Sequence, residues 1–188
     1  MMGTRGVIAR LTERKVKGNI YFSFKGRYHH WDSYPSGLGK TLYNLYNEFF
    51  NKDLVKMLKV LIDDHPAGWS TINGADFSLN AGWIGNSGAD YENKEVKKQP
   101  VCYCHGDRHE DEWLCTDKNA SGSGCEWAYA FDTKKKLMKV FASMTIVNDK
   151  TVKMIGAWGM GDPKATWIEV ATVNLDDKEP DWNKMEKV

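Results

Sequence analysis

The sequence lacks any long run of apolar residues, which limits the ways in which the protein could meet a membrane. No stretch approaches the roughly 18 consecutive apolar residues that a membrane-spanning helix requires. The opening MMGTRGVIARLTERK contains no apolar segment of the kind found in secretory signal peptides. We therefore expect a cytoplasmic protein with no membrane partner.

Net charge is also nearly absent. The chain has 26 Lys and Arg residues against 25 Asp and Glu residues, and its pI is about 7.6. Proteins that bind nucleic acid usually carry a basic excess, so no nucleic-acid partner is evident. With 41% hydrophobic and 27% charged residues, the 188-residue chain has the composition of one globular domain. Its partner is expected to be an unidentified small molecule or protein.

A regular alternation of strands and helices is missing, and this absence favours an α+β fold. Aromatic and alternating apolar residues predict a strand at 4–11 and two short strands within 18–31, around a turn at Lys25–Gly26. Apolar residues three and four apart predict two consecutive helices, at about 36–50 and 53–64. We expect a mostly antiparallel sheet with both helices packed on one face.

The rest of the chain is expected to complete a single domain over residues 1–188. Residues 67–125 are rich in Gly, Asn and Asp and hold all four cysteines, which indicates a loop-rich insertion. Strand patterns return after residue 126, and the charged residues 176–188 are expected to form a frayed tail.

The segment WDSYPSGLGKTL, residues 31–42, ends like a nucleotide-binding P-loop but lacks the first glycine of that motif. The position of that glycine holds Tyr34, and Pro35 removes an amide of the kind that cradles phosphate. Lys40 and Thr41 are instead expected in the first turn of a surface helix. A P-loop NTPase is therefore disfavoured.

Polar and aromatic side chains gather where the strands pass into the first helix. In an extended segment His30 and Asp32 would point to the same side, where an imidazole beside a carboxylate suits ligand binding or acid–base chemistry. Arg5, on a strand that could lie next to this segment, could neutralise Asp32 or hold an anion. The same groups could equally do no more than satisfy buried polar atoms. The candidate ligand-binding residues are Arg5, His30, Trp31, Asp32 and Tyr34.

The motif GTRG at 3–6, followed about 25 residues later by YHHWDSYPSGLG, resembles a family of small, largely uncharacterised proteins of bacteriophages and fungi. The resemblance covers about residues 3–45, and phage members often have Cys where this chain has His29. Because the family has no established activity, the resemblance implies a surface of interest and not a reaction. The matching residues are Thr4, Arg5, His30, Trp31, Asp32, Tyr34 and Pro35, with Gly37 and Gly39 nearer the fungal version.

The cysteines follow the spacing C-x-C-x10-C-x9-C, which leaves three states open. Thiolates with or without one histidine could form a tetrahedral zinc site, although C-x-C is a strained spacing for two ligands of one metal. Two disulfides, pairing Cys102 or Cys104 with Cys115 or Cys125, or four free thiols are the alternatives. The candidate metal ligands are Cys102, Cys104, Cys115, Cys125, His105 and His109.

No nucleophile and no complete set of metal ligands is evident in the sequence. We therefore expect a binding or interaction module whose polar site lies around Asp32. The alternative is a small hydrolase or transferase that uses His30 and Asp32 as an acid/base pair.

Overall fold

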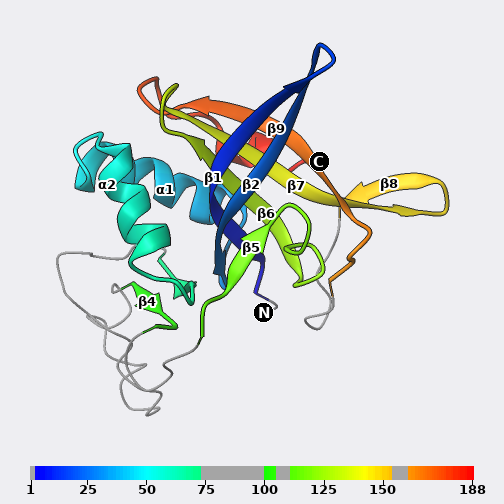
Figure 1. Cartoon of the computed structure of the whole chain (residues 1–188), viewed down its shortest axis with the longest axis horizontal. Helices are drawn as coiled ribbons and strands as arrows, with labels where there is room; N and C mark the ends of the chain where they lie inside the picture. Colours follow the sequence, from blue (N-terminus) through cyan, green and yellow to red (C-terminus); the bar gives the residue numbers. More distant parts are fainter. Residues whose placement is uncertain (1–2, 73–99, 105–110, 154–160) are drawn as a thin grey trace.

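The computed structural model describes residues 3–72, 100–104, 111–153 and 161–188 of the chain, which form one twisted sheet with helices on one side (Figure 1). The path through the sheet is β4-β3-β2-β1-β6-β7-β8, with β5 paired to β2 and β9 paired to β7. The strands are β1 Arg5–Val16, β2 Asn19–His29, β3 Trp69–Thr71, β4 Val101–Cys102, β5 Leu114–Thr116, β6 Cys125–Asp132, β7 Leu137–Val147, β8 Lys150–Lys153 and β9 Thr166–Asn174.

The sheet is mixed, which corrects the expectation of a mostly antiparallel arrangement in one respect. Antiparallel pairs prevail among the described strands, but β1 lies parallel to β6 and β2 lies parallel to β3. Parallel neighbours need a long crossover connection, and the two helices supply it between β2 and β3. The α+β class is confirmed in its coarse form.

Two consecutive helical segments follow β2, as the spacing of apolar residues predicts. The first consists of η1 Pro35–Gly39, α1 Lys40–Asn44 and η2 Leu45–Phe49, and the second of α2 Leu54–Leu58 and η3 Lys59–Asp63. The η segments are π-helical turns, with bonds such as Phe50 N to Leu45 O at 2.8 Å. The Asp53 side chain accepts from Lys56 N at 2.9 Å and so caps the second segment.

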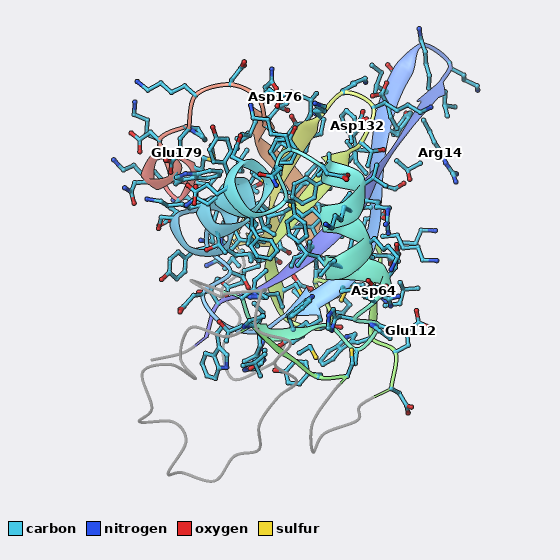
Figure 2. The ribbon with its side chains drawn as sticks, turned by 90° about the vertical axis from the view of Figure 1, so that its left-hand side faces the viewer. Arg14, Asp64, Glu112, Asp132, Asp176 and Glu179 are labelled. Carbon is cyan, nitrogen blue, oxygen red and sulfur yellow. The ribbon has the colours of Figure 1, made fainter. Side chains whose placement is uncertain are left out.

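The strands β1 and β2 form a long hairpin, and this overturns the expected turn at Lys25–Gly26. The hairpin turns instead at Lys17 and Gly18, whose φ angles are 49° and 87°. Positive φ at both central residues is the geometry that matches the twist of a tight hairpin. Gly26 lies in the middle of β2, opposite Ala9. The hairpin projects beyond the rest of the sheet, with Arg14 near its outer end (Figures 1 and 2).

Both faces of the sheet are covered. The helices pack on one face, where Leu38, Leu42 and Leu58 meet Trp127 and Tyr129 in one large apolar core. Because alternate residues of a strand point to opposite faces, Val7 and Ala9 of β1 enter a second, smaller core while Ile8 enters the first. The second core also contains Phe24, Tyr28, Tyr103, Cys115, Cys125, Ala128 and Phe141.

The end of the chain packs against the first helix, although its charge predicts a frayed tail. The short helix α3 Trp182–Met185 buries Trp182, whose ring lies 5.9 Å from that of Tyr43. The Glu186 carboxylate accepts from Ser36 N at 2.7 Å. This carboxylate satisfies one of the amides that a helix leaves unbonded at its start.

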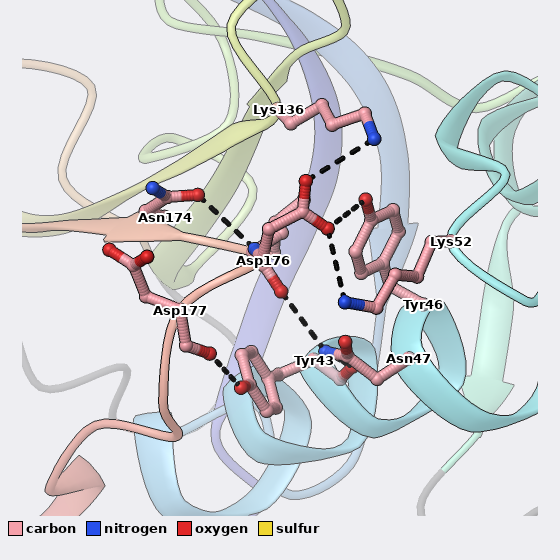
Figure 3. Close-up of polar contacts among 9 residues, drawn as sticks. Tyr43, Tyr46, Asn47, Lys52, Lys136, Asn174, Asp176 and Asp177 are labelled. Atoms are coloured by element: carbon pink, nitrogen blue, oxygen red, sulfur yellow. Dashed lines mark hydrogen bonds and ion pairs between the residues drawn. The ribbon is translucent and has the colours of Figure 1, made fainter.

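The loop after β9 is held to the first helix and to the β6–β7 turn by Asp176 (Figure 3). Its carboxylate accepts from the Tyr46 hydroxyl at 2.9 Å and pairs with Lys136 at 3.2 Å and Lys52 at 3.4 Å. The hydrogen bond from Tyr46 lowers the pKa of Asp176 despite the opposing effect of burial. The fully buried Tyr46 thus fastens the end of the sheet to the helical layer.

Replacing Tyr46 by Phe should lower the free energy of unfolding by up to about 1 kcal/mol, because one partly buried hydrogen bond to Asp176 is lost while the ring remains. Urea unfolding of the variant measures this. The matched control is Tyr21→Phe, at a ring that is 55% exposed on the hairpin, and it should change stability little. Equal losses in the two variants would show that the bond to Asp176 contributes nothing.

Candidate functional site

The junction between β2 and the first helix is built from backbone hydrogen bonds to two neighbouring segments. His30 N donates to Trp69 O at 3.0 Å and Trp31 N donates to Ser70 O at 3.1 Å, so the chain runs beside β3. On the other side, Ser33 N donates to Thr4 O at 2.9 Å. The residues between the strand and the helix are therefore held in place although they belong to no regular element.

Asp32 takes an uncommon backbone conformation that turns the chain into the helix. Its φ angle is 54°, in the left-handed region that Asp tolerates better than most residues. Its carbonyl accepts from Leu38 N at 3.0 Å, and a Cβ at Gly37 would lie only 2.4 Å from that carbonyl oxygen. The close approach explains the glycine at 37. The positive φ angle of Asp32 also shows that the segment is not extended there. The expectation that His30 and Asp32 point to the same side assumed an extended segment, so it loses its basis.

The aromatic members of the predicted site form a partly exposed cluster. The Trp31 side chain is 40% exposed, and its ring meets that of His30 edge-on with centroids 4.6 Å apart. A Cβ at Gly3 would lie 2.4 Å from the Trp31 ring, so the ring lies against the backbone at Gly3. The Nδ1 atom of His30 is hydrogen-bonded to the Tyr28 hydroxyl at 2.7 Å. The His30 ring is thus fixed from two sides.

The charged and phenolic members of the predicted site have different electrostatic neighbours. Asp32 is exposed, and its charge reinforces the effect of burial in raising the pKa of Tyr34. The half-buried Arg5 pairs with Cys125 in the β1–β6 ladder, and its charge opposes the rise that burial causes in the pKa values of Tyr28 and Cys125. The described contacts therefore associate Arg5 with Tyr28 and Cys125, and Asp32 with Tyr34.

A buried His–Ser pair lies beneath this surface, and the sequence reasoning did not identify it. His29 and Ser33 are fully buried, with Nδ1 of the histidine 2.7 Å from the serine Oγ. Nε2 accepts from Ile72 N at 3.3 Å, so Nδ1 carries the proton and donates to Ser33, whose hydroxyl donates to the His29 carbonyl at 3.3 Å. In this arrangement the histidine does not act as a base toward the serine. Burial, reinforced by the charge of His30, lowers the pKa of His29 to about 3.

The Gly-Lys-Thr that resembles a P-loop lies inside the first helix. Gly39 has helical angles, and a Cβ there would lie 2.9 Å from Tyr129 and 3.2 Å from Trp182. The glycine thus permits close packing of the helix on the sheet. The Lys40 ammonium lies 3.8 Å from the Glu179 carboxylate at the surface.

The four cysteines separate into two groups, and none forms a disulfide. Cys115 and Cys125 are buried in the second core, where burial and a hydrogen bond between them raise the pKa of the Cys125 thiol. Cys102 and Cys104 lie instead with His65, and their ligand atoms are within 4.8 Å of one another. This group could hold a metal ion. The other two predicted ligands, His105 and His109, lie outside the described residues.

His65 was missed because nothing near it in the sequence indicates a metal ligand. It stands 37 positions before Cys102, and only the strand pairing of β3 with β4 brings the two together. The sequence near His65 shows only that a helix ends at the Pro66–Gly68 turn and that a strand follows.

Comparison with models of protein families, with curated proteins and with solved structures finds no match for this chain. Among the described residues, no helix has the length and apolar character needed to cross a membrane. The resemblance to the phage and fungal family therefore rests on residues 3–45 alone.

Proposed function

We propose that this protein is an interaction module that binds a partner through the surface formed by Trp31 and Asp32. The observation that carries this proposal is the exposure of an indole, 40% accessible, on a backbone held by hydrogen bonds to β3 and to Thr4. Tryptophan supplies much of the binding energy at protein interfaces because it brings a large apolar area at small entropic cost.

The chemistry of this surface favours a partner that presents a cationic side chain. The Trp31 ring offers a π face and Asp32 offers a carboxylate one residue away, while Glu186 also contributes negative potential at Tyr34. An Arg or Lys side chain could lie over the indole and pair with the carboxylate. We therefore propose a protein partner with a basic segment.

The contacts of His30 support binding over acid–base catalysis. Its Nδ1 atom is hydrogen-bonded to the Tyr28 hydroxyl, and the Trp31 ring packs against its ring in a T-shaped contact. A general base needs a nitrogen within reach of the proton that it removes. The hydrolase or transferase alternative therefore has less support than the binding module.

Two further elements of the proposal rest on the sequence. Membership of the phage and fungal family would make the Trp31–Asp32 surface a shared feature of these proteins, since both residues belong to the matching motif. A cytoplasmic setting would agree with four cysteines none of which forms a disulfide.

Truncating Trp31 to Ala should weaken binding at least about tenfold if the indole is the anchor of the interface. The test is a displayed peptide library, enriched on the immobilised wild-type protein, followed by titration of the recovered peptides. We expect peptides that contain Lys or Arg to be enriched. Asp32→Asn should weaken the binding of these peptides, and because Asn also tolerates a positive φ angle the backbone should be retained.

The matched control is Phe49→Ala, which removes an aromatic ring of similar exposure, 41%, from the first helix. It should leave binding unchanged, and thermal unfolding should show that Trp31→Ala remains folded. Recovered peptides that bind Trp31→Ala and wild type equally well, or a library without enrichment, would exclude the proposed surface.

A further inference from the structure

His65, Cys102 and Cys104 bring a ring nitrogen and two sulfur atoms together at the end of the second helix, apart from the Trp31–Asp32 surface. The three ligand atoms lie within 4.8 Å of one another. Cys102 is 1% exposed, while His65 and Cys104 are half-buried. We refer to these three residues as the His-Cys-Cys group.

Backbone hydrogen bonds fix the positions of these three residues. Gly68, with φ 83°, closes the turn after the helix by donating to His65 O at 3.0 Å. Trp69 then pairs with Cys102 in the β3–β4 ladder, and Tyr103 N donates to Gly68 O at 3.0 Å. The chain therefore brings the three residues together through its own backbone pairing.

The second helix is in turn fastened to the sheet just before His65. Arg10 makes a two-point ion pair with Asp63, at 2.8 Å for each bond, and Arg27 Nε donates to Ile62 O at 2.8 Å. These contacts join the helix end to β1 and β2. The histidine thus extends from a fixed point, as a preorganised metal ligand requires.

Two contacts hold members of the group in place. Ala67 N donates to Cys104 Sγ at 3.1 Å, so this sulfur lies against the turn that follows His65. The His65 ring lies 4.2 Å from the Trp69 ring, and the Trp69 indole is held by a bond to Leu61 O at 2.9 Å. In metalloproteins, contacts of this kind orient the residues that bind the metal directly.

The donor set and its dimensions fit zinc. Tetrahedral zinc has bonds of about 2.3 Å to sulfur and about 2.0 Å to nitrogen, which places its ligand atoms roughly 3.5–3.8 Å apart. Atoms that already lie within 4.8 Å reach that spacing by small side-chain rotations. Thiolates with imidazole favour zinc over calcium or magnesium, which prefer oxygen ligands.

We propose that His65, Cys102 and Cys104 bind one Zn²⁺, with the fourth coordination position taken by water or an added ligand. Two carboxylates near this end of the molecule, Asp64 and Glu112 (Figure 2), pair with Lys59 at 2.5 Å and Arg27 at 2.7 Å, and neither belongs to the group. The ion joins the helix end to β4 across a long stretch of sequence. Because the three ligands come together only in the folded chain, binding of the ion stabilises the fold.

The test uses the full chain, purified from zinc-supplemented medium without a metal-affinity step, and elemental analysis of bound zinc. We expect about one zinc per chain in wild type and less than about a tenth of that in Cys102→Ala with Cys104→Ala, because the remaining histidine binds weakly. The matched control is Cys115→Ala with Cys125→Ala, which removes the same number of thiols from the second core and should retain the zinc.

Cobalt substitution shows which atoms hold the ion. Co²⁺ in the wild-type protein should give sulfur-to-metal charge-transfer absorption together with the intense visible bands of tetrahedral cobalt. Cys102→Ala or Cys104→Ala alone should remove about half of the charge-transfer intensity. His65→Ala should keep that absorption but shift the visible bands.

A chelator-treated wild-type sample keeps the test decisive if the double variant does not fold. Zinc added back to this sample should bind at one ion per chain and raise the midpoint temperature of thermal unfolding. Failure of wild type to bind zinc, retention of zinc without Cys102 and Cys104, or loss of zinc without Cys115 and Cys125 would each overturn the proposal. The last result would restore the four-cysteine site that the spacing allows.

Discussion

Lowering the pH from 7 to 5 is expected to reduce the free energy of unfolding by about 2 kcal/mol through the single buried side chain of His29. The ring is fully buried between Ser33 and Ile72 N, and its two nitrogens are engaged by these groups in the neutral form. A proton on Nε2 would remove the acceptor that Ile72 N requires. It would also place a charge in an apolar core.

The sign follows from the two pKa values. Burial, together with the charge of His30, lowers the pKa of His29 to about 3 in the folded protein, whereas the ordinary value is 6.5. Between these values the unfolded chain binds a proton that the folded protein does not bind. The contribution is therefore fully present above pH 6.5 and is lost as the pH falls, by up to about 1.4 kcal/mol per pH unit.

Urea unfolding at half-unit steps from pH 7 to pH 5 measures this slope. The range stays above about pH 4, the ordinary pKa of carboxyl groups. Asp63, Asp176 and Glu169, whose pKa values are lowered in the folded protein, lose their contribution mainly below that pH. His29→Gln keeps a neutral polar side chain of similar reach, so it should destabilise the protein at pH 7 but flatten the slope. A slope that is equally steep in His29→Gln would assign the pH dependence to other groups.

The local structure around His29 could be predicted only in part. Apolar residues at spacings of three and four predict both helices, and the cap at Asp53 follows from the same local chemistry. The segment that joins strand to helix was also predicted, because His30 to Pro35 carry the signals of a strand end and a helix start. These features depend on residues close together in the chain.

Features that depend on distant partners could not be predicted in the same way. The parallel pairing of β1 with β6 joins residues about 120 positions apart, and no local pattern specifies it. His65 becomes a candidate ligand only when β3 pairs with β4. The buried pairing of His29 likewise involves Ile72 N, 43 positions away, and no local pattern specifies it.

Gly26 shows how a local signal can mislead. A Lys-Gly pair within a strand pattern usually marks a turn, but here the glycine lies where the neighbouring backbone leaves no room for a Cβ. It pairs with Ala9 of β1 on one side and with Cys115 of β5 on the other. A glycine inside a paired strand indicates close backbone approach as well as a turn.

Replacing Gly26 by Ala should therefore destabilise the protein by more than about 3 kcal/mol, or prevent folding, because the new methyl group would overlap with backbone atoms. A Cβ at this position would lie 1.9 Å from Ile8 O and 2.4 Å from the Ala9 Cα. Backbone in the middle of a sheet cannot move aside as the end of a flexible side chain can. Relief of the overlap would require β1 and β2 to separate where they join the two cores.

The matched control is Gly122→Ala, where the nearest atom would lie at 3.4 Å, an ordinary contact, so its effect should stay within about 0.5 kcal/mol. Chemical unfolding of both variants measures the difference, and the yield of folded protein reports the outcome if Gly26→Ala cannot be purified. Similar stability of the two variants would mean that the β1–β2 pair opens at little cost. In that case the close approach at Gly26 would not be what holds the register of β2, and hence the positions of His29 to Tyr34 that follow it.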